Sequence, residues 1–94
     1  MENKLQKIID YYGIDKQLIV WIEELSELTK ELCKYQRTGV FSPNAELEVT
    51  DVQVCLDQIK LAFNYSTKRQ KENYEYKINR TLEGIEKWII YLNG

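Results

Sequence analysis

The chain has 94 residues, of which 44% are hydrophobic and 30% charged, and its net charge at pH 7 is −2. This length and composition predict one folded domain over residues 1–94 rather than a disordered segment. The slightly negative charge argues against a nucleic-acid polymer as partner, and no apolar stretch approaches the roughly 20 residues of a membrane span. The first ten residues lack the apolar core of a secretion signal, so we expect a cytoplasmic protein.

The sequence contains no histidine and two cysteines, Cys33 and Cys55. A Ser-His-Asp or Cys-His mechanism within one chain is therefore excluded. The cysteines lack the C-x-x-C spacing of a zinc site, and the absence of a secretion signal favours two reduced thiols over a disulfide. Acid–base chemistry has to come from carboxylates, Lys, Tyr, Cys or metal-bound water.

Sparse glycines divide the first part of the chain into two predicted helices. The first covers about residues 2–12 and stops at Gly13. The second begins after Asp15, which we expect to be its N-cap, and runs to about Arg37. Its apolar residues recur at helical spacing, and they are Leu18, Ile22, Leu25 and Leu32.

Two further helices follow a loop over about residues 38–44. Ser42 and Pro43 are typical of an N-cap followed by a first-turn proline, and they begin a third helix that ends near Asn64. Thr67 with Gln70 fits a capping box for a fourth helix that continues to about Leu92.

The fourth helix carries an apolar seam with the 4-3-4-3 spacing of a coiled coil, formed by Ile78, Leu82, Ile85, Ile89 and Leu92. No strand-like alternation competes with these helices. The sequence therefore predicts an all-α fold, a helical bundle of about four helices in which the second and third form an antiparallel hairpin. A short chain with surplus apolar surface is also expected to form a homo-oligomer.

Acidic pairs lie on both helices of the expected hairpin. Glu24 and Glu27 are three residues apart on the second helix, and Glu48 and Asp51 are three apart on the third. Residues at this spacing share a helix face, so an antiparallel pairing can bring four carboxylates together. Such a cluster is suited to Mg²⁺, which prefers oxygen ligands and leaves positions for water and phosphates.

The plainer interpretation is a solvated acidic face, since Lys30 and Lys34 are placed for surface ion pairs. Two acidic pairs on adjacent helices favour the metal, because like charges gathered together destabilise a fold without a cation. Basic residues follow in residues 65–80, which carry five Lys or Arg against two Glu. Among them Lys77 and Arg80 are three apart and can serve as phosphate contacts.

Taken together, these motifs resemble the MazG-like, all-α nucleoside-triphosphate pyrophosphatase superfamily. Its E-E-x-x-E motif matches Glu23 to Glu27, and its E-x-x-D motif matches Glu48 to Asp51 after twenty intervening residues. The lysine and Asn-Arg pair of the family resemble Lys77-Ile78-Asn79-Arg80, so the resemblance covers about residues 17–80.

The resemblance implies Mg²⁺-dependent hydrolysis of a nucleoside triphosphate to the monophosphate and pyrophosphate. It implies that the metal ligands are Glu24, Glu27, Glu48 and Asp51, and that the phosphate contacts are Lys77, Asn79 and Arg80. Glu23 is then an auxiliary carboxylate, and Glu23 and Glu27 are the candidates for activating water. Family members generally form dimers or tetramers.

Two alternatives stay open. The first is a non-catalytic helical interaction protein that uses the apolar seam of the fourth helix. The second is a phosphohydrolase of the same fold that acts on another diphosphate-containing compound. Gln17 and Trp21 can both face the carboxylates, and Trp21 is either a base-stacking side chain or a core anchor.

Overall fold

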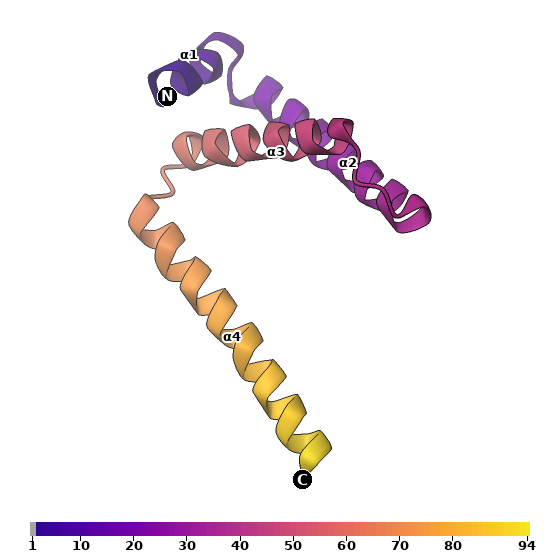
Figure 1. Cartoon of the computed structure of the whole chain (residues 1–94). Coiled ribbons are helices and arrows are strands. Elements are labelled where there is room, and N and C mark those ends of the chain that lie inside the picture. Colours follow the sequence, from indigo (N-terminus) through magenta and orange to yellow (C-terminus); the bar gives the residue numbers. More distant parts are fainter. Residues whose placement is uncertain (1) are drawn as a thin grey trace. The chain divides into compact units, whose positions relative to one another are not determined.

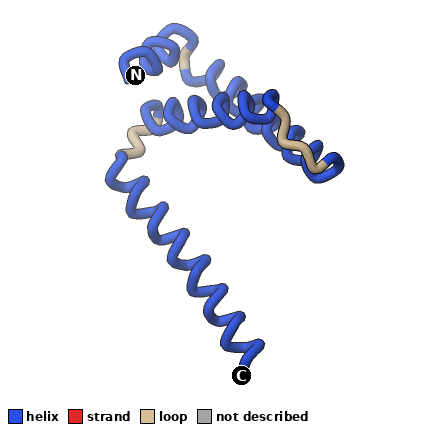
Figure 2. The backbone as a smooth tube through the Cα atoms, viewed as in Figure 1, coloured by secondary structure: helices blue, strands red, loops and turns tan. Residues whose placement is uncertain are grey.

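The computed structural model of the protein describes residues 2–94, and the described residues form four helices and no strand. The helices are α1 (Glu2–Tyr12), α2 (Ile14–Thr38), α3 (Pro43–Ala62) and α4 (Thr67–Asn93), as Figures 1 and 2 show. The predicted all-α class and the number of helices are confirmed. The chain divides after Asn64 into a first unit with α1, α2 and α3 and a second unit with α4, and each is described by itself.

Helices α2 and α3 of the first unit lie side by side and run antiparallel (Figure 1). Near the start of α2, the Trp21 indole Nε1–H donates to Gln58 Oε1 near the end of α3 at 2.8 Å. Near the other end of the pair, Asn44 Nδ2 donates to Glu31 Oε1 at 3.0 Å. These two contacts fix the direction and the register of the hairpin, and the predicted hairpin is confirmed.

The core of the first unit is small and centred on Trp21, which is only 1% exposed. Ile9 of α1 and Ala45 and Cys55 of α3 are the other buried hydrophobic residues, so all three helices contribute. Phe63, just after α3, meets the Trp21 ring edge-on, with 6.2 Å between the ring centroids. The full burial of Trp21 makes it a core anchor and leaves no face for a base to stack on.

The turn between α2 and α3 follows from its glycine, serine and proline. Gly39 adopts φ 70°, a left-handed conformation that glycine takes without strain, and its N–H donates to the Tyr35 carbonyl oxygen. Ser42 then accepts a hydrogen bond from the Ala45 N–H at 3.1 Å, and Pro43 occupies the first turn. The predicted start of the third helix is confirmed.

The other predicted boundaries need correction. Asp15 is not an N-cap, because Gly13, with φ 84°, joins α1 directly to α2 and leaves Asp15 in the first helical turn. The cap of α4 is Ser66 rather than Thr67, since the Ser66 hydroxyl accepts from the Arg69 N–H. Helix α3 ends at Ala62, and Asn64, where we placed its end, has a positive φ of 53°.

The second unit consists of α4, none of whose residues is buried. The residues of its apolar seam are between 46% and 63% exposed, and they are Ile78, Leu82, Ile85, Ile89 and Leu92. Trp88 and Tyr91 stack on one another beside the seam, with 5.5 Å between ring centroids. None of the helices in residues 2–94 is both long enough and apolar enough to cross a membrane.

The Ser42 cap offers a direct test of the α2–α3 turn. Ser42→Ala removes the acceptor for the Ala45 N–H, and we expect the free energy of unfolding to fall by about 1 kcal/mol. Ser26→Ala is the matched control, because the Ser26 hydroxyl only bonds back to the Ile22 carbonyl within α2, and its cost should stay below about 0.5 kcal/mol. Urea denaturation measures both; equal effects would show that the cap contributes nothing specific.

Candidate metal site

Three carboxylates meet across the α2–α3 hairpin. Glu24 comes from α2, Glu48 and Asp51 come from α3, and one carboxylate oxygen of each lies within 4.8 Å of those of the other two. Glu48 and Asp51 lie on the same face of α3 because they are three residues apart. Glu24 lies one turn beyond Trp21, whose bond to Gln58 sets the register that brings it opposite them. Glu24 and Glu48 are half-buried, whereas Asp51 is exposed.

Partial burial, together with the neighbouring charges, raises the pKa of two of the carboxyl groups. Partial burial raises the pKa of Glu24 above its usual value, and the charges of Asp51, Glu48 and Glu27 add to the rise. Partial burial also raises the pKa of Glu48, followed by the charges of Asp51, Glu27 and Glu31. Both groups are therefore harder to ionise than an isolated glutamate, and a cation bound between them would favour their charged forms and so lower both pKa values.

One oxygen of the site has no partner. Glu48 Oε2 is shielded from solvent and accepts no hydrogen bond from any group in residues 2–94. A shielded carboxylate oxygen without a donor costs free energy, because its hydration is lost and nothing replaces it. A divalent cation held by the three carboxylates would satisfy it, so the donor set and the orphaned oxygen both fit Mg²⁺.

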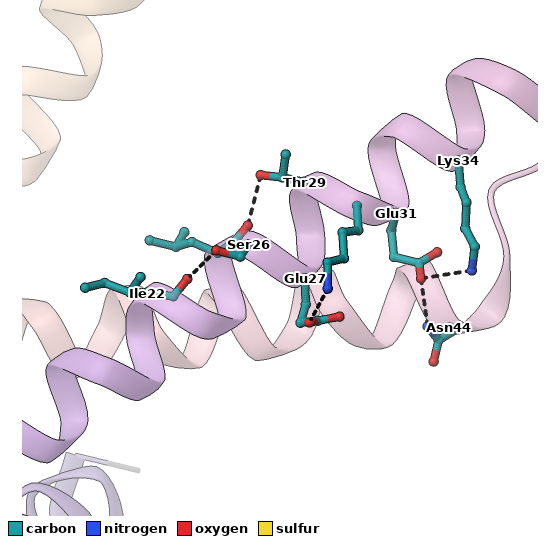
Figure 3. Close-up of polar contacts among 9 residues, drawn as sticks. Ile22, Ser26, Glu27, Thr29, Glu31, Lys34 and Asn44 are labelled. Carbon is teal, nitrogen blue, oxygen red and sulfur yellow. Dashed lines mark hydrogen bonds and ion pairs between the residues drawn. The ribbon is translucent and has the colours of Figure 1, made fainter.

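Glu27 and Glu23, the other acids of the motif, lie outside this group of three. Glu27 is exposed and accepts from Lys30 Nζ at 3.2 Å, the surface ion pair that the plainer interpretation of the sequence expected (Figure 3). It still lies near enough to raise the pKa of Glu24 and Glu48. Glu23 is exposed on α2. The assignments of Glu27 as a ligand and of Glu23 or Glu27 as the residue activating water stay predictions.

Glu31 is an acidic residue whose burial the sequence interpretation missed. It is 8% exposed, and its Oε1 accepts from Asn44 Nδ2 at 3.0 Å and from Lys34 Nζ at 3.5 Å (Figure 3). Its position was visible in the spacing of Glu24, Glu27 and Glu31, which continues one helix face by three and then four residues. Glu31 extends the acidic face toward the turn and accepts hydrogen bonds there from its own partners.

Cys55 lies four residues after Asp51 on α3 and is buried. Burial raises the pKa of its thiol, and the charges of Glu24 and Asp51 raise it further. The thiol therefore stays protonated and is neither a nucleophile nor a ligand for a hard cation. Cys55 and Cys33 are both free, so the expectation of two unpaired thiols is confirmed.

The predicted phosphate contacts Lys77, Asn79 and Arg80 belong to α4 in the second unit, where all three are exposed. Lys77 and Arg80 share a helix face, as their spacing predicted. Their role toward the carboxylates of the first unit stays a prediction.

Compared with known proteins, the chain matches no family model, no curated protein and no solved structure. The functional assignment accordingly depends on the geometry of the carboxylates and on the motifs in the sequence.

The raised pKa values predict how the metal-free protein responds to pH. The folded state holds protons on Glu24 and Glu48 more tightly than the unfolded state, whose value is near 4.5. The contribution of these two groups to the free energy of unfolding is therefore fully present below about pH 4.5, the pKa of the unfolded state. This contribution is lost as the pH rises through the pKa values of the folded state. In chelator, the melting temperature should fall more steeply with rising pH for the wild type than for Glu48→Gln. Glu46→Gln, which removes one charge elsewhere on α3, should keep the wild-type slope; parallel slopes for all three proteins would contradict the clustering.

Proposed function

We propose that this chain is a Mg²⁺-dependent nucleoside triphosphate pyrophosphohydrolase that cleaves NTP or dNTP to the monophosphate and pyrophosphate. The observation that carries the proposal is the meeting of Glu24, Glu48 and Asp51, with Glu48 Oε2 left without a donor. The reaction class comes from the MazG-like motifs that these same residues complete.

The three carboxylates suit a metal that must also hold substrate. Mg²⁺ takes about six oxygen ligands and in nucleotide enzymes is held by a few carboxylates, with water and phosphate oxygens completing the set. Glu27 can become a fourth ligand, since its ion pair with Lys30 is exposed and such pairs contribute little. When bound, Mg²⁺ would neutralise negative charge that develops on the phosphates during cleavage.

Other side chains of the chain would activate the water molecule and bind the phosphates. Glu27 or Glu23 would orient a water molecule and accept its proton as the water attacks one of the two phosphorus atoms of the α–β anhydride. The bond from that phosphorus to the bridging oxygen then breaks, which releases the monophosphate and pyrophosphate. The guanidinium of Arg80 would bind phosphate oxygens with paired N–H donors, while Lys77 and Asn79 add a charge and an amide. With no histidine in the chain and the Cys55 thiol protonated, carboxylates remain the best proton acceptors.

The alternative is a helical interaction protein, favoured by the exposure of the α4 seam. An isolated helix is marginal in water, because most helical stability in proteins comes from packing an apolar face. The exposure of the seam also supports assembly of the enzyme. We propose a homodimer or homotetramer in which the seam packs against a helix of another copy. The other alternative, a phosphohydrolase of the same fold, would differ from the proposed enzyme only in its substrate, another diphosphate-containing compound.

The metal hypothesis is tested with Asp51→Asn, using Asp57→Asn as control. Asp57 lies on the same helix but outside the cluster, bonded to Gln53. At a hundredfold excess of Mg²⁺ over its Kd, the wild type should gain about 2.7 kcal/mol of stability. Asp51→Asn should lose most of that gain and of pyrophosphate release, yet be no less stable than wild type in chelator, because like-charge repulsion is relieved.

Thermal melts with Mg²⁺ or chelator, repeated with a non-hydrolysable triphosphate, and a pyrophosphate assay measure these effects. Asp57→Asn should keep both the Mg²⁺ effect and the activity. If Mg²⁺ changes no melting temperature and no triphosphate is cleaved, the enzyme hypothesis fails and the interaction protein replaces it.

The assembly proposal predicts a dimer or tetramer at micromolar concentration in light scattering. Ile85→Lys places a charge in the middle of the seam and should shift the mass toward the monomer. Tyr76→Lys alters an exposed residue of α4 outside the seam and should leave the mass unchanged. A monomeric wild type would rule the assembly out.

A further inference from the structure

Beside the carboxylates, the first unit contains an open cavity of about 550 Å³ among α1, α2 and α3. Glu24 and Asp51 are among its lining residues, so the cavity adjoins the candidate metal site. Tyr12 and Lys16 contribute to the lining from the α1–α2 corner, and Val20 and Val54 are among its apolar residues. A mostly apolar cavity with a few polar groups is the usual form of a small-molecule site.

Two glutamines of this cavity are buried. Gln17 is 5% exposed and Gln58 is 4% exposed, and both line the cavity. The Gln17 carboxamide makes no hydrogen bond with any other group in residues 2–94, and Gln58 makes only the one with Trp21. Neither carboxamide has a fully shielded atom left without a partner, so the donors and acceptors that make no hydrogen bond open into the cavity and are available to a bound ligand.

The orientation of the Gln58 carboxamide is settled by its neighbour. An indole N–H can only donate, so the Gln58 atom 2.8 Å from Trp21 Nε1 must be the oxygen. The nitrogen of the carboxamide, with its two N–H donors, is left for the cavity. Gln17 has no such neighbour and can turn either its oxygen or its nitrogen toward a ligand.

We propose that this cavity holds the nucleobase of the substrate and that Gln58 donates a hydrogen bond to a carbonyl oxygen of the base. Gln17 then accepts from the ring N–H beside that carbonyl. Bases with this carbonyl and N–H edge are uracil, thymine, hypoxanthine and guanine, whereas adenine offers an amino group in the carbonyl position. The inference rests on the proposed function, because it takes the phosphates to lie at the carboxylates that line the same cavity.

A carbonyl oxygen fits this donor better than a ring nitrogen does. The oxygen projects from the ring and accepts from a broad range of directions. A ring nitrogen is recessed between neighbouring atoms and requires the donor to approach along one line. Gln58 cannot move to find that line without breaking its bond to Trp21.

The test uses nucleosides, because they carry no phosphate and need no metal. Inosine and adenosine are both purine ribosides of nearly equal size that differ at this edge, and NMR titration of the protein gives both Kd values. We expect inosine to bind about tenfold more tightly than adenosine, the factor expected of roughly one hydrogen bond. Equal affinities, tighter binding of adenosine or no spectral shift with either nucleoside would overturn the inference.

Three variants separate recognition from packing. Gln58→Met keeps the length of the side chain but removes the donor, and should bring the affinity ratio near one. Gln53→Met, the same change on the exposed face of α3, should leave the ratio at about ten. Trp21→Phe keeps an aromatic core but frees the Gln58 carboxamide to turn over, so the ratio should fall while inosine still binds. A ratio that Gln58→Met leaves unchanged in a folded protein, confirmed by circular dichroism, would also overturn the inference.

The two proposals fail separately. Selective nucleoside binding without release of pyrophosphate from any triphosphate would reject the hydrolase and retain the base site. Pyrophosphate release from inosine and adenosine triphosphates at equal rates, with equal nucleoside affinities, would reject the base site and retain the hydrolase.

Discussion

The hydrogen bond between the Trp21 indole and the Gln58 carboxamide is the constraint on which the geometry of the first unit depends. Both side chains are buried, and separating them would leave a shielded donor and acceptor unpaired, at a cost of about 1–3 kcal/mol for each group. Sliding α3 along α2 by one turn breaks this bond, so the register of the hairpin is specified by a polar contact rather than by apolar packing alone. Glu24 lies one turn beyond Trp21, and Asp51 lies two turns before Gln58. The bond that closes the core therefore also brings the carboxylates together.

The same register explains why the acidic face is divided into two parts. Toward the turn, Glu31 accepts hydrogen bonds from Asn44 and Lys34, so this carboxylate already has partners of its own. Toward the core, partial burial and neighbouring charges raise the pKa values of Glu24 and Glu48, and Glu48 keeps an oxygen without a donor. A face built only for solubility would expose its carboxylates to water, where repulsion is weak. Partial burial of like charges is a cost to the metal-free fold, and it has an evident compensation only where a cation binds.

Local signals in the sequence predicted much of this fold. The Gly13 stop, the Ser42–Pro43 start and the helical periods of α2 and α3 act over a few residues, and they gave the helices and the hairpin. The assignment of Asp15 and Thr67 to the N-terminal caps was wrong. Several neighbouring residues are suitable caps, and the backbone conformation, which the sequence does not show, determines which of them is used. The acidic motifs located three carboxylates that meet. Gln58 could not be found, because its importance arises from Trp21, thirty-seven residues away in the chain. Gln17 was predicted to be able to face the carboxylates, but its burial beside the cavity is visible only in three dimensions.

The division of the chain into two units has a consequence for catalysis. The first unit contains the carboxylates and the cavity, which are the groups that we propose hold a metal and a planar base. The second unit supplies the cations Lys77 and Arg80 on the same helix as the apolar seam. A phosphate chain carries several negative charges, which carboxylates alone repel, so cationic groups are needed beside the metal. Because the seam and the cations share α4, the proposed assembly and the proposed phosphate contacts depend on the same helix. If both proposals hold, disrupting the seam should also weaken the binding of triphosphate, even with the carboxylates and the cavity intact.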